Sequence, residues 1–361
     1  NMRFNLALVF KSAGYEVIFI SPYDRYSDKI KQEFEYIDIS LNTKGINPIE
    51  DLKTIYRYYK IYKDIKPDII LHYTIKPNIY GTLASSILNI PTINNIAGLG
   101  TLFIKQNIIT KIAKWLYKVS QKKAIKVFFQ NQDDFKMFVD ERLVQKEKCD
   151  VLPGSGVDIT KFIPVEKEDD GIFRFLLVSR MLWAKGIQEF VEAAKIIKVK
   201  YGNIEFQLLG HLDMASPTAI SKKQMDTWVT DGYIKYLGSS DDVRVEIAQA
   251  DCVVLPSFYR EGTPRILLES ASMEKPIITT DNIGCRDVVD DRINGYLCEV
   301  KNSKDLADKM EMMLNLSDIE RNDMGKAGRV KMINEFDEKI VIDKYLFTVE
   351  NIFNLKPVTD C

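Results

Sequence analysis

Two glutamates lie on either side of an expected helix start. Glu261 and Glu269 are separated by seven residues within the segment 257–281, which follows a short β-branched run typical of a buried parallel strand. Thr263 can cap a helix, and Pro264 suits its first position because the missing N–H would have no partner there. The free N–H groups and positive dipole end of such a helix attract anions. The segment therefore indicates a site for a phosphate with a sugar attached, between the two carboxylates.

Two cations follow another expected strand. Arg180 closes the strand expected at 173–180, and Lys185 lies five residues further on, just before a helix. A guanidinium fork and an ammonium can neutralise the charge that grows on a diphosphate leaving group without a metal. An equally open interpretation is that both are solvated loop charges. Likewise, a loop carboxylate before a helix is often only a partner of its dipole.

Several common signatures are missing from the sequence. The pairs Gly98 and Gly100, and Gly154 and Gly156, lack the third glycine of a dinucleotide-binding turn. The chain has no phosphate loop, no nucleophile elbow, no pair of aspartates two apart and only two histidines. These features disfavour nicotinamide enzymes, phosphate-loop hydrolases and a dedicated metal site. We therefore expect no metal or other cofactor.

The elements that must position these residues alternate between strands and helices in two runs, before and after a polar, acidic linker at 162–171. This is the pattern of doubly wound parallel sheets. We expect an α/β fold of two Rossmann-like domains that face each other across a cleft, with ligands at the carboxyl ends of the strands. The expected domains are residues 1–165 and 166–337, and a final helix in 338–361 can pack back on the first. The expected strands are 15–22, 68–74, 91–97, 126–131, 173–180, 204–210, 234–238, 251–256 and 276–280.

The beginning of the chain departs from this alternation. Residues 1–14 have the pattern of a helix, whereas a chain of this class normally begins with a strand. We therefore expect the first strand of the N-terminal domain, and part of a ligand site at its carboxyl end, to be missing from this sequence.

Positive charge is concentrated in the first half. Residues 1–165 carry 24 Lys and Arg against 17 Asp and Glu, a net charge of +7, and the remainder has a net charge of −8. Residues 105–126 contain seven lysines and no acid. This expected helix can pack its apolar face on the sheet, or it can rest on an anionic membrane. The missing acids favour peripheral membrane contact. The apolar face consists of Ile108, Ile112, Trp115 and Val119.

The compartment follows from composition. The chain has no run of 18 apolar residues and no signal peptide at its start. Its five cysteines show no C-x-x-C spacing, and this absence is typical of reduced thiols. We expect a cytoplasmic protein at the cytoplasmic face of the inner membrane, with no nucleic-acid partner.

The segments VSRMLWAKG, YLGSSDDV, GCRDVV and NGYL, together with residues 250–281, resemble the donor-binding half of the family 4 retaining glycosyltransferases, which have the GT-B fold. In the first half, YTIKPNIYGTLAS, GLGT, FFQNQDD and PGSGVD are similar to members that extend polyprenyl-diphosphate-linked glycans. This resemblance implies transfer, with retention, of a hexose or N-acetylhexosamine from a nucleotide diphosphate sugar, with uridine as the expected base. The implied acceptor is a lipid-diphosphate-linked sugar in polysaccharide or glycan biosynthesis.

The resemblance also implies residue roles. Arg180 and Lys185 would bind the donor diphosphate, Glu269 the ribose hydroxyls and Glu261 the donor sugar, while amides near Thr263 would hold the distal phosphate. His72 stands, one residue out of register, where relatives place a histidine at the reacting centre, although a core histidine is the alternative. The expected catalytic residues are Arg180, Lys185, Glu261 and His72. The expected substrate-binding residues are Glu269, Gly262, Thr263, Pro264, Arg265, Gly238, His211, Gly156, Arg286, Gly98 and Gly100.

Two alternatives remain open. A sugar-nucleotide epimerase on the same fold would act without an acceptor. A non-catalytic module would bind a nucleotide sugar or glycan without turning it over.

Overall fold

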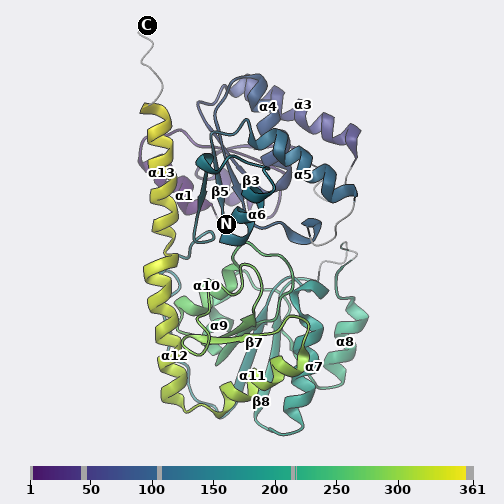
Figure 1. The fold of residues 1–361 in the computed structure, drawn as a ribbon. Helices are drawn as coiled ribbons and strands as arrows, with labels where there is room; N and C mark the ends of the chain where they lie inside the picture. The colour runs from purple at the N-terminus through teal and green to yellow at the C-terminus, as the bar shows by residue number, and fades with distance from the viewer. Residues whose placement is uncertain (1–2, 42–46, 104–107, 213–215, 217, 355–361) are drawn as a thin grey trace. The chain divides into compact units, whose positions relative to one another are not determined.

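The computed structural model describes residues 3–41, 47–103, 108–212, 216 and 218–354, and the chain divides into two compact units (Figure 1). The boundary expected after residue 165 falls inside the second unit. The residues just before it pack there: Val157 N donates to Phe336 O over 2.9 Å, and Phe162 O accepts from Ser272 Oγ over 2.7 Å. The first unit comprises Asn1–Ala97, Lys105–Ser155 and Lys339–Cys361, and the second Gly98–Ile104 and Gly156–Glu338.

The first unit contains two parallel sheets. One has the order β3-β4-β5-β6, and β1 pairs with β2 in the other. The strands are β1 (Ile18–Ser21), β2 (Glu35–Asp38), β3 (Ile70–Tyr73), β4 (Thr92–Ile96), β5 (Lys126–Phe129) and β6 (Cys149–Val151). The helices are α1 (Phe4–Ser12), α2 (Ser27–Lys31), α3 (Pro48–Ile65), a π-helical turn (Pro77–Gly81), α4 (Thr82–Ile87), α5 (Ile108–Gln121), α6 (Gln132–Asp140), a 3₁₀ turn (Lys146–Lys148) and α13 (Glu338–Asn354).

Long-range packing closes the first unit. Tyr345 of α13 is buried against Phe128 of β5, with ring centroids 4.8 Å apart, and its hydroxyl accepts a hydrogen bond from Asn95 Nδ2 over 2.9 Å. Leu6 and Phe10 of α1 join the same core. The last helix therefore packs with the first unit, although the second unit precedes it in sequence.

The second unit is built on one parallel sheet of six strands in the order β12-β11-β10-β7-β8-β9. The strands are β7 (Phe173–Val178), β8 (Ile204–Leu209), β9 (Lys235–Tyr236), β10 (Cys252–Leu255), β11 (Ile277–Thr280) and β12 (Gly295–Cys298). The helices are α7 (Ile187–Lys198), α8 (Lys222–Thr230), α9 (Arg244–Gln249), α10 (Arg265–Ser272), α11 (Ser303–Asn315) and α12 (Asp318–Lys331), with shorter 3₁₀ turns at Gly100–Phe103 and Trp183–Lys185 and a π-helical turn at Met332–Phe336.

Two elements of this unit escaped the sequence analysis. β12 has only four residues, and α12 has few apolar residues, so neither shows a strong hydrophobic period. A capping box between Ser317 and Glu320 starts α12. The capping box therefore indicates the start of α12 more clearly than the hydrophobic pattern of the helix does.

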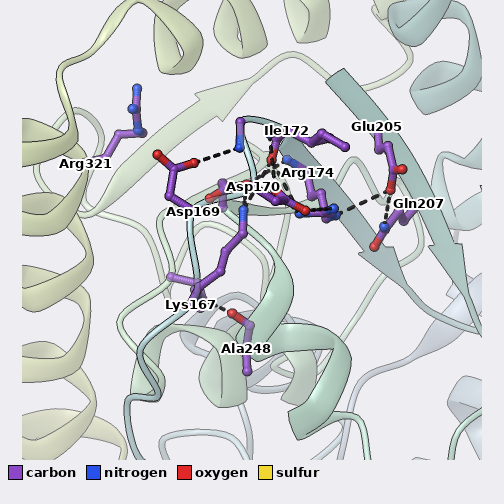
Figure 2. A network of polar contacts seen from close by, with 12 residues as sticks. Lys167, Asp169, Asp170, Ile172, Arg174, Glu205, Gln207, Ala248 and Arg321 are labelled. Atoms are coloured by element: carbon purple, nitrogen blue, oxygen red, sulfur yellow. Dashed lines mark hydrogen bonds and ion pairs between the residues drawn. The ribbon is translucent and has the colours of Figure 1, made fainter. Parts of the chain in front are cut away.

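The segment expected as a linker is tied to the amino end of β7 by charged groups (Figure 2). Asp251 Oδ2 accepts from Lys167 Nζ over 2.6 Å and from the backbone N of Arg174 over 2.7 Å. The Arg174 side chain also binds Asp170 and lies 3.4 Å from Glu205 Oε2. Its hydrogen bond to Asp170 lowers the pKa of that carboxyl to about 2. This network lies at the strand ends opposite those that lead into the site described next.

Candidate functional site

The loops that follow β7 and β10 meet at the carboxyl edge of the second sheet. β10 pairs directly with β7, so the chain leaves both strands at the same edge. The backbone N–H groups of Phe258 and Tyr259 both donate to Ala184 O over 3.0 Å. These contacts hold residues 256–264 against the loop that carries Arg180 and Lys185.

Lys185 and Glu261 form an ion pair between the two loops, and each side chain is only 12% exposed. Ser257 Oγ donates to the same Oε1 atom of Glu261 over 3.1 Å. The Lys185 ammonium lies 5.1 Å from the centroid of the Tyr259 ring. The structure thus brings together a cation and a carboxylate that lie 76 positions apart in the sequence.

Tyr259 connects this pair to the second expected cation. Burial raises the pKa of the Tyr259 hydroxyl, and the hydrogen-bonded guanidinium of Arg180 opposes this shift. Tyr259 was missed by sequence reasoning. Its signal was an aromatic residue two positions before Glu261, in the loop between a strand and a helix.

A second set of contacts holds the glutamate loop from the side of β11. Asn282 Nδ2 donates to the carbonyls of Ser257, over 3.2 Å, and Tyr259, over 3.1 Å. Gly284 has a φ of +77°, and a Cβ there would lie 1.8 Å from Gly262 O. Only glycine allows that approach without a shift of the backbone. Asn282 and Gly284 are positioning residues that the sequence analysis did not single out.

Gly98 and Gly100 lie against the same loop. A Cβ on Gly98 would lie 2.4 Å from Gly262 N, and one on Gly100 would lie 2.4 Å from the Tyr259 hydroxyl. Gly100 N donates to Arg260 O over 3.1 Å. Their φ values of +96° and +59° suit glycine. These two expected site residues therefore belong with the second unit.

The helix after the glutamate loop starts one residue later than expected. Pro264 is the N-cap of α10, with φ −65° and ψ 118°, and its own side chain makes no capping hydrogen bond. The expected N-cap, Thr263, and the expected first helical residue, Pro264, are therefore each one position too early. The extended ψ of Pro264 delays the first helical residue to Arg265.

Glu269 lies on α10, and its side chain is 13% exposed. Burial raises the pKa of its carboxyl, and the Arg265 guanidinium, 2.9 Å away, opposes the shift. Arg265 Nε also donates to Glu269 Oε1 over 3.1 Å. The second carboxylate is thus oriented by the residue one turn earlier and not by Lys185.

Three other expected residues surround this edge less closely. Gly238 O accepts from Gly210 N over 2.6 Å. His211 O accepts from Met181 N over 3.1 Å, which places His211 beside the Arg180 loop. The His211 side chain is exposed. Arg286 Nη1 lies 3.1 Å from Asp281 Oδ1.

Gly156 lies in a different packing contact. Its φ is +71°, and a Cβ there would lie 2.4 Å from Glu338 Cα at the start of α13. This contact gives Gly156 a packing role, and its predicted role in substrate binding stays a prediction.

His72 lies in the core of the first unit and is 3% exposed. Its Nε2 lies 2.9 Å from the Tyr62 hydroxyl and its Nδ1 3.0 Å from Asn94 Oδ1. Burial lowers the pKa of His72 to about 4, and the hydrogen bond to Asn94 opposes that shift only partly. A Cβ on Gly81 would lie 2.4 Å from its Nε2. This geometry matches the core-histidine interpretation and offers no support for contact with substrate.

Two features of the described residues bear on metals and on membranes. No group of three or more His, Cys, Asp or Glu side chains in them is arranged to hold a metal ion. Within the same residues, no helix combines the length and apolar character needed to cross a bilayer.

Two families match most of the chain. The family described as Glycosyl transferases group 1 matches residues 158–331, and Glycosyl transferase 4-like matches residues 2–131. A relative from Campylobacter jejuni, N,N'-diacetylbacillosaminyl-diphospho-undecaprenol alpha-1,3-N-acetylgalactosaminyltransferase, is 29% identical over 96% of this chain and 94% of its own length. The Escherichia coli UDP-Gal:alpha-D-GlcNAc-diphosphoundecaprenol alpha-1,3-galactosyltransferase is 26% identical over 95% and 88%.

Solved structures agree on the fold. A glycosyltransferase from Rickettsia africae has a TM-score of 0.80 at 20% identity, covering 98% of this chain and 95% of that one. Anabaena HepE, solved with UDP and glucose, has a TM-score of 0.77 at 17% identity, covering 96% and 95%. The expected fold class, two Rossmann-like domains of the GT-B type, is confirmed.

Proposed function

Because the chain belongs to the glycosyltransferases of these two families, we propose that it transfers a hexose or N-acetylhexosamine with retention. The donor is a uridine diphosphate sugar. The acceptor is a lipid-diphosphate-linked sugar in surface polysaccharide or glycan biosynthesis. The names of both relatives specify a sugar on diphosphoundecaprenol as the acceptor. The observation that carries the proposal is the meeting of Lys185, Glu261, Tyr259 and Arg180 where β7 and β10 end.

The ion pair suggests how the donor is received. Lys185 is neutralised by Glu261 in the free protein. An incoming diphosphate offers Lys185 a second anionic partner, and Glu261 can then accept hydrogen bonds from hydroxyls of the donor sugar. Arg180 adds a guanidinium beside the same loop. Both cations would stabilise the negative charge that grows on the nucleotide as the glycosidic bond breaks.

The helix start would hold the rest of the donor. The N–H groups at the beginning of α10 carry the positive end of the helix dipole, which suits the distal phosphate. Glu269, held by Arg265, can accept from two neighbouring ribose hydroxyls at once. In this mechanism the bond from the anomeric carbon to the diphosphate oxygen breaks with its electrons on the leaving oxygen. The acceptor hydroxyl then attacks the same face and gives its proton to the leaving diphosphate oxygen, and no protein nucleophile takes part.

The place of the reaction follows from the acceptor and from charge. A lipid-linked acceptor lies in a membrane, and the first half of the chain, residues 1–165, has a net charge of +7. Anionic lipids attract such a charge. We place the enzyme in peripheral contact with the cytoplasmic face of the inner membrane.

The test is transfer from a panel of UDP-hexoses and UDP-N-acetylhexosamines to a synthetic sugar on diphosphoundecaprenol, with the product's anomeric configuration read by NMR. Lys185→Ala and Glu269→Ala should each lower turnover by about 100-fold or more, the loss expected when a preorganised charge contact is removed. Lys222→Ala on α8, an exposed lysine of the same unit, is the matched control and should keep normal turnover. Near-normal turnover in either site variant contradicts the assignment, and so does an inverted product.

A further inference from the structure

α5 packs on the first unit through its small and polar side chains. The inward face consists of Thr110, Ala113, Tyr117, Ser120 and Gln121, all buried. Gln121 Oε1 accepts from Asn94 Nδ2 over 2.7 Å, and the Tyr117 ring lies 5.1 Å from that of Phe138. The interpretation in which the apolar face of this helix packs on the sheet is therefore wrong.

Three of the four side chains of the expected apolar face point to solvent instead, and the fourth, Val119, is half-buried. Ile108 is 74% exposed, Ile112 49% and Trp115 62%. The spacing of four and then three residues places them on one stripe of the helix. This stripe is termed the α5 apolar stripe below. Water-exposed isoleucine and tryptophan side chains gathered in this way mark an interaction surface.

Lysines flank the α5 apolar stripe. Lys111 and Lys118 are exposed on the neighbouring line of the helix, and Lys122, also exposed, follows directly after its last residue. Lys114 is held 2.7 Å from Glu141 and contributes less free charge. Lys105 lies outside the described residues. The free surface of the helix thus combines an apolar line with a cationic one.

This combination fits a lipid surface better than a protein partner. Lysine is depleted at protein interfaces. Helices that lie in the plane of a membrane carry Lys on the polar face and Trp or aliphatic residues on the other, and lysine stems reach past apolar groups to lipid phosphates. Tryptophan also favours the level of the headgroups.

We infer that α5 is a membrane-docking helix, with Ile108, Ile112 and Trp115 inserted among the headgroups of an anionic leaflet while Lys111, Lys118 and Lys122 pair with lipid phosphates. The inference deepens the proposed function, on which it rests only for the idea that the acceptor lies in a membrane. Net charge alone would hold the chain above the surface. The α5 apolar stripe makes the contact an insertion.

The experiment measures binding of the full chain to vesicles of phosphatidylcholine with and without phosphatidylglycerol, by flotation and by tryptophan fluorescence. Trp115 is the exposed one of the three tryptophans, because Trp228 is buried and Trp183 packs against it with ring centroids 6.0 Å apart. Its emission should shift to shorter wavelength on anionic vesicles. Trp115→Phe should abolish the shift.

Charge reversal gives a matched pair of variants. The double variant Lys111→Glu with Lys118→Glu should weaken binding to anionic vesicles by about 25-fold or more. The reason is that the loss of each lysine weakens binding by about fivefold. Lys222→Glu with Lys223→Glu on α8 makes the same charge change at exposed positions of the second unit and should leave binding nearly unchanged. Ile108→Ser with Ile112→Ser should weaken binding with no change of charge. A melting midpoint close to that of the parent chain shows that each variant is folded.

Three results would overturn the inference. The first is equal binding to neutral and anionic vesicles. The second is unchanged binding in the α5 variants. The third combines two observations: the parent chain does not bind vesicles, and sedimentation shows that it self-associates while the α5 variants do not. That result would assign the α5 apolar stripe to a second copy of the chain. Vesicle binding is scored without turnover, so a failure of the proposed transfer reaction leaves this test intact. Conversely, α5 variants should keep transfer to acceptor dissolved in detergent.

Discussion

At the scale of single residues, Glu261 holds the Lys185 ammonium in position before any diphosphate is present. Ser257 and Tyr259 contact this pair, so that neither side chain has much freedom to turn away. A cation ordered in advance costs less to recruit when charge develops on a leaving group. Tyr259 is then a positioning residue that couples Lys185 to Arg180.

His72 also lies in an environment that shifts its pKa, and its effect concerns stability. In the folded chain the His72 pKa is lowered to about 4 from an ordinary value of 6.5. Between these values the unfolded chain binds a proton that the folded chain does not. The contribution of neutral His72 to the free energy of unfolding is therefore complete above pH 6.5. It is lost as the pH falls toward 4, and the total loss is about 3 kcal/mol.

We predict that His72→Gln flattens the fall in the free energy of unfolding between about pH 6.5 and pH 4, measured by urea titration at several pH values. His211→Gln is the control, since His211 is the second of the two histidines and its side chain is exposed. An unchanged slope in His72→Gln would show that other groups cause the acid sensitivity.

At the scale of elements, the site depends on how closely two loops approach. The loop after β7 turns at Gly186, with a φ of +76°, and a Cβ there would lie 2.1 Å from Pro256 O at the end of β10. Lys185 immediately precedes this turn. The separation of the loops thus sets the separation of Lys185 and Glu261.

Gly186→Ala should therefore destabilise the chain and also weaken binding of UDP. Gly232 provides the control, because its φ is +75° but a Cβ there meets no atom within 4 Å. Gly232→Ala should cost about 1–2 kcal/mol, the strain of a left-handed backbone alone, and leave UDP affinity unchanged. Gly186→Ala should cost more, because the backbone of the two loops must move apart. Urea unfolding and calorimetric titration measure the two effects, and equal losses in both variants would refute the close-approach argument.

At the scale of the whole molecule, two units share the work that the proposal requires. The second unit holds the residues proposed for the donor, and the first carries α5, the helix proposed for the membrane. The charge of the chain is divided in the same way, with a net charge of +7 in the first unit and −8 in the second. Donor and membrane should therefore order separate parts of the chain.

Hydrogen exchange followed by mass spectrometry tests this division. UDP should slow exchange in residues 98–100, 179–186 and 257–269, whereas anionic vesicles should slow it in residues 108–122. The reason is that a ligand protects the amides whose opening competes with its binding. Protection of α5 by UDP alone, with the loops of the second unit unchanged, would contradict the assignment.

Much of this architecture could be predicted from local patterns. The strands expected at 204–210 and 276–280 agree with β8 and β11 to within one residue at each end. Lys185, Glu261 and Glu269 were placed correctly in the loop after a strand or on the helix that follows one, whereas Arg180, expected to close a strand, lies two residues after the end of β7. These signals are local, because strand periodicity, caps and turns depend on residues a few positions apart.

Only the tertiary structure decided which of these pieces touch. Sheet order places β10 beside β7. Close packing between distant segments brings Gly98 and Gly100 to the glutamate loop and lets Gly284 support that loop. The burial of His72 and the outward face of α5 were likewise decided by neighbours such as Tyr62 and Asn94. Local periodicity records which side chains share one face of a helix. It does not record which residues that face packs against, because this packing depends on contacts between residues far apart in the chain.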